Sequence, residues 1–192
     1  MRLSLAFAIG LLLGASVMAL PKLVCRAYAA LKGLRQNAAA KGGGNLLHTE
    51  QKFTFVARAP VEVVAPLFGA DKERVWAPGW DPSFIWPATA HDRQGMVFTV
   101  PHGHQTAVWV ASSFEPLSGR VQYVYVLPDV MATVITLEVT PEENQTRVKV
   151  EYDRTALRFS ANDVVRRFSK EDDKSGPEWE KQINDYLETV PK

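Results

Sequence analysis

Apolar and polar residues alternate with a period of two along several stretches of the chain, and this pattern predicts β-strands. Residues 51–58 show it first, and in residues 146–152 Val148, Val150 and Tyr152 share one face while Lys149 and Glu151 share the other. Turn-like separators that contain Pro, Gly or Asn lie between successive stretches, which favours an antiparallel meander. We therefore expect a sheet with one dry face over residues 51–58, 95–101, 105–114, 120–127, 132–140 and 146–152.

Helical spacing appears on both sides of these strands. Residues 60–68 carry one apolar stripe that begins with Pro60 near the first turn and stops at Gly69, which predicts a short helix. Three prolines and a glycine between Pro78 and Pro87 predict irregular structure or an edge strand. Near the C-terminus an apolar stripe runs from residue 164 to residue 190, but residues 172–176 are expected to interrupt it, with a second helix beginning at Pro177.

The N-terminal segment differs from the rest of the chain, because it has no charge from Leu5 to Leu20. Residues 1–20 are interpreted as a signal peptide with cleavage after Ala19, or as an uncleaved membrane anchor. The positive residues that follow the apolar run disfavour export and support the anchor. Residues 1–49 contain no Asp or Glu, which also allows a mitochondrial presequence. The domain is thus expected to be exported (periplasmic or secreted) or anchored to a membrane.

Residues 21–45 form a basic, Ala-rich linker. Residues 23–40 have helical composition, which fits either a helix on an anionic membrane surface or a plain linker helix. Residues 41–45 (Lys-Gly-Gly-Gly-Asn) then act as a flexible joint, so the folded domain is predicted to cover residues 46–192.

Composition restricts the function. The chain has 192 residues, and all 21 acidic residues lie after residue 49, which leaves the folded domain mildly acidic and argues against nucleic acid as a partner. Cys25 is the single cysteine, so an intramolecular disulfide and CxxC-type sites are excluded. Glycine-rich phosphate loops and a Ser-His-acid motif are absent. No cofactor is expected.

The order of elements and several local sequences resemble the START-like superfamily, also called SRPBCC or Bet v 1-like. The resemblance rests on Ala59-Pro60 before a short helix and on four short sequence segments, at residues 73–82 (ERVWAPGWDP), 95–99 (GMVFT), 106–110 (TAVWV) and 152–157 (YDRTAL). These segments are similar to those of uncharacterised bacterial proteins of the polyketide cyclase and dehydrase type. It implies an α+β helix-grip fold, in which a twisted antiparallel sheet wraps around a long C-terminal helix and leaves a cavity for hydrophobic ligands. The expected break before Pro177 departs from that pattern.

Aromatic residues are the main candidates for a binding site, since they offer large apolar contact and, in Tyr and Trp, one polar group each. Arg154 could bind the anionic head of a ligand, or it could be a solvated strand end. The candidate cavity residues are Trp76, Trp80, Phe98, Trp109, Tyr123, Tyr125, Tyr152 and Arg154.

Other chemistry-bearing residues are interpreted as structural. His102 and His104 could share a metal ion, but they flank Gly103 in a predicted turn and lack a third ligand, so no metal is expected. A carboxylate among the tryptophans would have a raised pKa and could act as an acid or a base. Glu73 and Arg74, however, are expected to form a surface pair, and catalytic residues stay unknown.

Three functions remain open. The favoured one is binding or transport of a lipid, isoprenoid or aromatic compound in an internal cavity. The alternatives are an enzyme resembling a polyketide cyclase or dehydrase, and a structural protein with a closed core that binds a protein partner.

Overall fold

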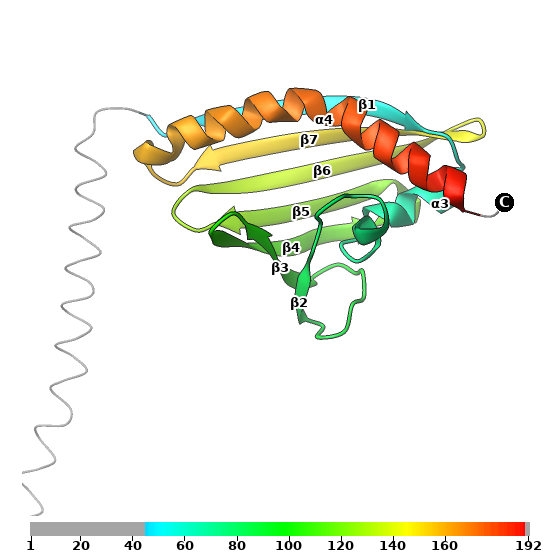
Figure 1. Ribbon diagram of the computed structural model, residues 1–192, viewed down its shortest axis with the longest axis horizontal. Coiled ribbons are helices and arrows are strands. Elements are labelled where there is room, and N and C mark those ends of the chain that lie inside the picture. Colours follow the sequence, from blue (N-terminus) through cyan, green and yellow to red (C-terminus); the bar gives the residue numbers. More distant parts are fainter. Residues whose placement is uncertain (1–44, 191–192) are drawn as a thin grey trace, which may run out of the picture. The chain divides into compact units, whose positions relative to one another are not determined.

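A single antiparallel sheet dominates the computed structural model, which describes residues 45–190. Its seven strands follow the order β1-β7-β6-β5-β4-β3-β2, so all neighbours except β1 and β7 are also neighbours in sequence (Figure 1). The predicted meander is confirmed. The strands are β1 (His48–Ala57), β2 (Ser83–Trp86), β3 (Val97–His102), β4 (Gln105–Glu115), β5 (Arg120–Leu127), β6 (Met131–Glu142) and β7 (Gln145–Ala156).

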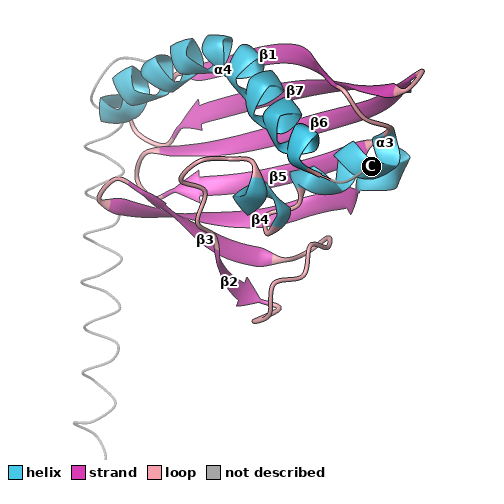
Figure 2. Cartoon of the chain, turned by 45° about the vertical axis from the view of Figure 1, so that its right-hand side comes forward, coloured by secondary structure: helices cyan, strands magenta, loops and turns pink. Residues whose placement is uncertain are grey.

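One long helix, α4 (Asn162–Thr189), crosses one face of this sheet and packs mainly against β1 and β7 (Figure 2). Short helical segments connect the first two strands, namely α3 (Val61–Val64), η1 (Ala65–Phe68) and η2 (Lys72–Val75). Two further turns of 3-10 helix, η3 (Pro116–Ser118) and η4 (Phe159–Ala161), precede β5 and α4. This is the helix-grip arrangement that the resemblance implied.

Strand alternation places the core on the helix side of the sheet. Val148 and Val150 of β7 are fully buried, whereas Lys149 and Glu151 of the same strand reach solvent and pair with each other at 2.8 Å. The largest fully buried side chains include Phe68 of η1 and Phe98 of β3. The expected edge strand exists as β2, which pairs only with β3 and has an irregular register between Phe84 and Trp86.

The predicted break in the C-terminal helix is wrong, because α4 runs for 28 residues through Pro177. Gly176 is buried against β1, and a Cβ there would lie 3.2 Å from the Cβ of Phe53, so the glycine permits close helix–sheet packing. Buried residues on both sides of the proline, Asp172 and Ile183 among them, attach the two halves of α4 to the same sheet. Tertiary packing therefore outweighs the local preference of Pro177 to end a helix, and α4 changes direction along its length (Figure 1).

The predictions for residues 1–44, namely the signal peptide or anchor, the basic linker helix and the glycine joint, lie outside the described residues. Between residues 45 and 190, no helix is both long and apolar enough to cross a membrane.

Candidate functional site

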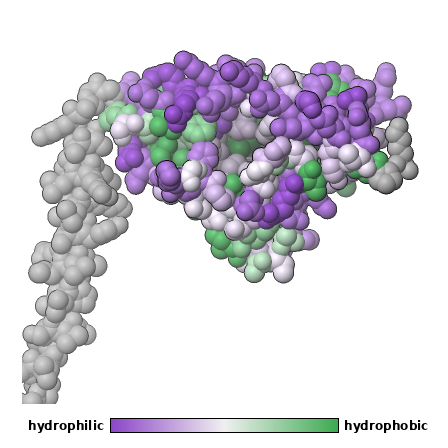
Figure 3. Space-filling model, in the orientation of Figure 1, coloured by the Kyte–Doolittle hydropathy of each residue, from purple (hydrophilic) through white to green (hydrophobic). Residues whose placement is uncertain are grey.

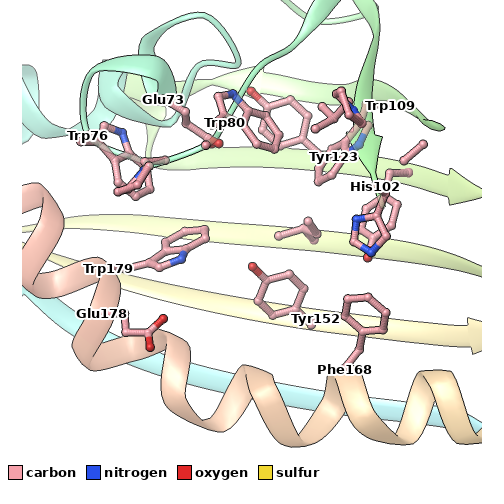
Figure 4. Close-up of a pocket in the computed structure, with 18 of the residues that line it drawn as sticks. Glu73, Trp76, Trp80, His102, Trp109, Tyr123, Tyr152, Phe168, Glu178 and Trp179 are labelled. Atoms are coloured by element: carbon pink, nitrogen blue, oxygen red, sulfur yellow. The ribbon is translucent and has the colours of Figure 1, made fainter. Parts of the chain in front are cut away.

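A cavity of about 400 Å³ lies between α4 and the inner face of the sheet. Its walls come from the segment that carries Trp76 and Trp80, from strands β3 to β7, and from the side of α4 that holds Phe168 and Trp179 (Figure 4). Several of these elements are far apart in sequence and meet only because the helix lies across the sheet. Figure 3 shows polar residues along the upper band of the face in view, where α4 lies, and more apolar residues toward its lower tip.

The structure brings all but one of the sequence-predicted candidates to this cavity. Phe98 is the exception, since it is fully buried behind the wall, with its ring centroid 5.7 Å from that of Trp109 and 6.2 Å from that of Trp80. It supports the lining and does not form it. The candidates that line the cavity are Trp76, Trp80, Trp109, Tyr123, Tyr125, Tyr152 and Arg154.

Backbone hydrogen bonds fix the two tryptophans of the irregular segment. The indole N–H of Trp76 donates to the carbonyl of Leu67 at 2.7 Å, and that of Trp80 donates to the carbonyl of Ala70 at the same distance. Each indole therefore satisfies its only polar group away from the cavity. On the opposite wall Trp179 of α4 meets Trp76 edge to face, with 5.3 Å between the ring centroids.

Arg154 occupies one end of the cavity and is 4% exposed, so the structure does not support a solvated strand end. Its Nε and Nη2 donate to the two carboxylate oxygens of Asp172 at 2.9 and 2.6 Å. Its Nη1 donates to the hydroxyl oxygens of Tyr125 at 2.5 Å and Thr133 at 3.3 Å. The guanidinium carbon also lies 4.4 Å from the centroid of the Tyr152 ring.

This network limits what Arg154 can offer a ligand. Asp172 neutralises the positive charge, and a guanidinium has five N–H donors, so one N–H of Nη2 is left without a partner among the described residues. Binding of an anionic head group, as the sequence suggested, would have to compete with a buried bidentate ion pair.

Glu73 lines another part of the cavity, and the expected surface pair with Arg74 does not form. Arg74 instead pairs with Asp81 at 2.7 Å and with Asp71 at 3.3 Å. No hydrogen bond or ion pair from the described residues reaches the Glu73 carboxylate. Burial raises the pKa of Glu73 well above its usual value, and the negative charge of Asp92 raises the pKa further.

The three cavity tyrosines use their hydroxyl groups differently. The hydroxyl of Tyr123 donates to the carbonyl of Phe68 at 2.9 Å, and that of Tyr125 accepts from Arg154. The Tyr152 hydroxyl has no partner among the described residues, and Figure 4 shows it directed into the cavity. Burial raises the pKa of Tyr152, so this group is a neutral O–H donor at physiological pH.

Comparison with solved structures identifies the architecture. A protein of Mesorhizobium loti superposes with a TM-score of 0.57 at 14% identity over 75% of this chain and 100% of that one. Norcoclaurine synthase from Thalictrum flavum, in complex with dopamine and hydroxybenzaldehyde, superposes with a TM-score of 0.55 at 10% identity over 77% of this chain and 91% of that one. Ara h 8.0201 gives a TM-score of 0.54 at 9% identity over 75% and 100%.

The chain has the Bet v 1-like fold. No protein-family model and no curated protein matches its sequence. At these identities the likeness concerns the fold, so the chemistry of the site has to be argued from the residues of this chain.

Within this Bet v 1-like fold, sequence reasoning missed the contribution of α4. Phe168, Glu178, Trp179 and Gln182 all line the cavity. Their helical spacing was visible, but the expected break before Pro177 hid the fact that one helix carries them. His102 was missed as a cavity residue as well: it is the last residue of β3, and its ring lies tilted against that of Phe168 with 5.2 Å between centroids.

Proposed function

We propose that the domain binds a small hydrophobic molecule with at least one ring in the cavity between the sheet and α4. The observation that carries the proposal is the lining itself, because four of the five tryptophans of the chain, Trp76, Trp80, Trp109 and Trp179, face one cavity of about 400 Å³. This volume is within the range of small-molecule sites, and rigid aromatic walls favour flat, ring-containing ligands.

Several polar groups share the lining with these aromatic rings, and such groups commonly fix a ligand's orientation in a pocket. The Tyr152 hydroxyl and the Glu73 carboxyl are without partners among residues 45–190, so both are free to bond a ligand. The cavity also gives this function more support than the closed-core alternative. Norcoclaurine synthase holds dopamine and hydroxybenzaldehyde on a similar fold, which agrees with a ring-binding role for this chain.

The proposal is tested by filling the cavity from one strand. Ala107 of β4 is buried and lines the cavity, whereas its neighbour Val108 points to the outer face and is 40% exposed. We expect Ala107→Leu to weaken binding of 2-naphthylmethanol by about tenfold or more. The larger side chain would occupy space that the ligand needs, and a mismatch of even one methylene in a hydrophobic pocket changes the binding free energy by roughly 1–3 kcal/mol. The measurement is a titration of tryptophan fluorescence with the full chain.

The matched control is Val108→Leu, which adds a methylene on the same strand outside the cavity and should leave binding unchanged. If Ala107→Leu lowers the melting temperature, Ala77→Leu, on the partly exposed wall segment, replaces it. Equal affinities in wild type and both cavity variants would contradict the proposal. Native mass spectrometry of the purified chain would then identify any molecule that it retains.

An enzyme resembling a polyketide cyclase or dehydrase is the second candidate, and the position of Glu73 favours it. A carboxyl group with a raised pKa, open to an aromatic cavity that also holds the Tyr152 hydroxyl, is suited to general acid–base catalysis. Glu73→Gln should slow cyclisation of a poly-β-ketone substrate by about 100-fold or more. The control Asp81→Asn changes an exposed carboxylate nearby, and equal rates in the two variants would remove Glu73 from the mechanism.

We also propose that residues 1–20 export the domain or anchor it to a membrane. Their uninterrupted apolar run supports this placement. A reporter fused after Lys41 distinguishes the two sides of the membrane, and the intact mass of the mature protein shows whether cleavage follows Ala19.

A further inference from the structure

The Glu73 carboxylate is partly buried in the cavity, and no residue of the described part of the chain provides it with a hydrogen bond or an ion pair. The side chain leaves η2 and points into the cavity between Trp76 and Trp80, with Trp179 on the opposite wall (Figure 4). The nearest basic side chain in sequence, Arg74, is held outside by Asp71 and Asp81. A partly buried polar group that the protein leaves without a hydrogen bond is available to water or to a ligand.

The charge balance of the lining is negative. Arg154 is the one Lys or Arg among the lining residues, and Asp172 already neutralises it. Two carboxylates, Glu73 and the exposed Glu178 of α4, face the cavity without an ion pair among the described residues. His102 is the remaining basic group of the lining. An anionic ligand would therefore meet uncompensated negative charge, whereas a cation would reduce it.

The aromatic groups around Glu73 strengthen the preference for a cation. Ammonium groups bind over the faces of aromatic rings, most strongly over tryptophan. The N–H groups of Trp76 and Trp80 are occupied by backbone carbonyls, so a ligand meets the rings of these residues and not their donors. A carboxylate beside indole rings offers an ammonium both an ion pair and a cation–π contact.

We propose that the cavity selects aromatic amines, with the protonated nitrogen held by the Glu73 carboxylate among Trp76, Trp80 and Trp179. This inference rests on the proposed binding function and narrows its ligand to a class. The aromatic part of the ligand lies against Trp109 and Tyr125, whose stacked rings are 4.3 Å apart between centroids.

Proton release should accompany binding. Burial shifts the Glu73 carboxyl of the empty cavity toward its protonated form, because it raises the pKa, whereas a bound ammonium stabilises the ionised form. The affinity for an amine should therefore rise with pH until Glu73 is ionised in the free protein. Other groups also act on Glu73 or on the ligand: Asp92 before β3, Tyr123 of β5, Tyr152 of β7 and Glu178 of α4. His102 also belongs to the lining, so a Glu73 variant is needed to isolate the contribution of Glu73 to the pH dependence.

The experiment compares three ligands that share one ring system, namely 2-naphthylmethylamine, 2-naphthylmethanol and 2-naphthoate. Dissociation constants of the full chain are measured by calorimetry between pH 5 and pH 8, in two buffers of different ionisation enthalpy. At neutral pH we expect the amine to bind about tenfold or more tightly than the alcohol, and the naphthoate to bind most weakly. Glu73→Gln should bring amine and alcohol to within about threefold and abolish the proton release, while Glu178→Gln keeps most of both.

The outcomes separate this inference from the function on which it rests. If amine and alcohol bind equally well to the wild type, or if the naphthoate binds most tightly, the selection of amines is wrong and the aromatic cavity remains. If none of the three binds, the ring-binding function is wrong and the inference fails with it. If Glu73→Gln preserves the difference between amine and alcohol, Glu73 is not the group that recognises the ammonium.

Discussion

Two charged side chains, Arg154 and Glu73, line the same aromatic cavity, but the protein supplies hydrogen-bond partners only to Arg154. Arg154 is enclosed by Asp172, Tyr125 and Thr133, with distances of 2.5 to 3.3 Å to their oxygen atoms. Glu73 has no partner among the described residues and faces the open space of the cavity. The residues next to Arg154 and Glu73 in sequence do not indicate which of the two side chains is paired.

The contrast separates a structural role from a binding role. A buried ion pair with its hydrogen bonds made ties β7 to α4, and its members have little left to offer a ligand. A carboxyl group without a partner weakens the empty protein and is available to a ligand that supplies a donor. Three experiments on stability test this division.

Breaking the Arg154 pair should have the largest effect. Asp172→Asn removes the negative charge and leaves a buried guanidinium uncompensated, which we expect to lower the free energy of unfolding by about 3–5 kcal/mol. Urea unfolding monitored by circular dichroism measures it. The double variant Arg154→Met with Asp172→Leu should recover most of the loss, since it removes both charges. A loss below about 1 kcal/mol in Asp172→Asn would mean that the pair is not structural.

Removing single tyrosine hydroxyl groups should also distinguish the structural groups around Arg154 from the groups that are free to bind a ligand. Tyr125→Phe takes away an acceptor of Arg154 and should lower the free energy of unfolding by about 1.5–3 kcal/mol, because a hydrogen bond to a charged group is lost. Tyr152→Phe is the matched control, since its hydroxyl has no partner within residues 45–190, and its effect should stay within about 0.5 kcal/mol. Equal losses in the two variants would contradict the division.

Glu73→Gln should stabilise the empty protein. The pKa of Glu73 is higher in the folded than in the unfolded state, so the folded state holds more protons between the two pKa values and the stability of the wild type falls as pH rises through this range. Asp92, whose pKa burial also raises, contributes in the same direction. Above this range we expect the variant to exceed the wild type by about 1 kcal/mol, as one pKa unit corresponds to about 1.4 kcal/mol. A variant less stable than the wild type at pH 8 would show that Glu73 has a partner.

Much of the sheet could be predicted from the sequence. The period-two pattern placed β5 at residues 120–127, as observed, and placed the other strands of the meander within a few residues. Between Pro78 and Pro87, where irregular structure or an edge strand was expected, the structure has the edge strand β2. These predictions succeed because one face of each strand is dry, so the alternation itself records which residues point inward.

The C-terminal helix shows where local patterns fail. Gly176 and Pro177 predicted a break, yet Gly176 is the position at which α4 approaches Phe53 of β1. A glycine that ends a helix and a glycine that permits close packing look alike in sequence. The difference depends on a strand more than a hundred residues away, which no local pattern reports.

The cavity residues divide in the same way. The sequence by itself determined the supply of aromatic residues and the inward faces of β5, β6 and β7, which put Tyr123, Tyr125 and Tyr152 on one surface. Only the tertiary structure decided which polar groups are paired, because Arg154 meets Asp172 through the crossing of α4 over β7, and Arg74 turns away from Glu73 toward Asp81. Periodicity fixes the direction in which a side chain points, whereas its partner depends on which elements pack together.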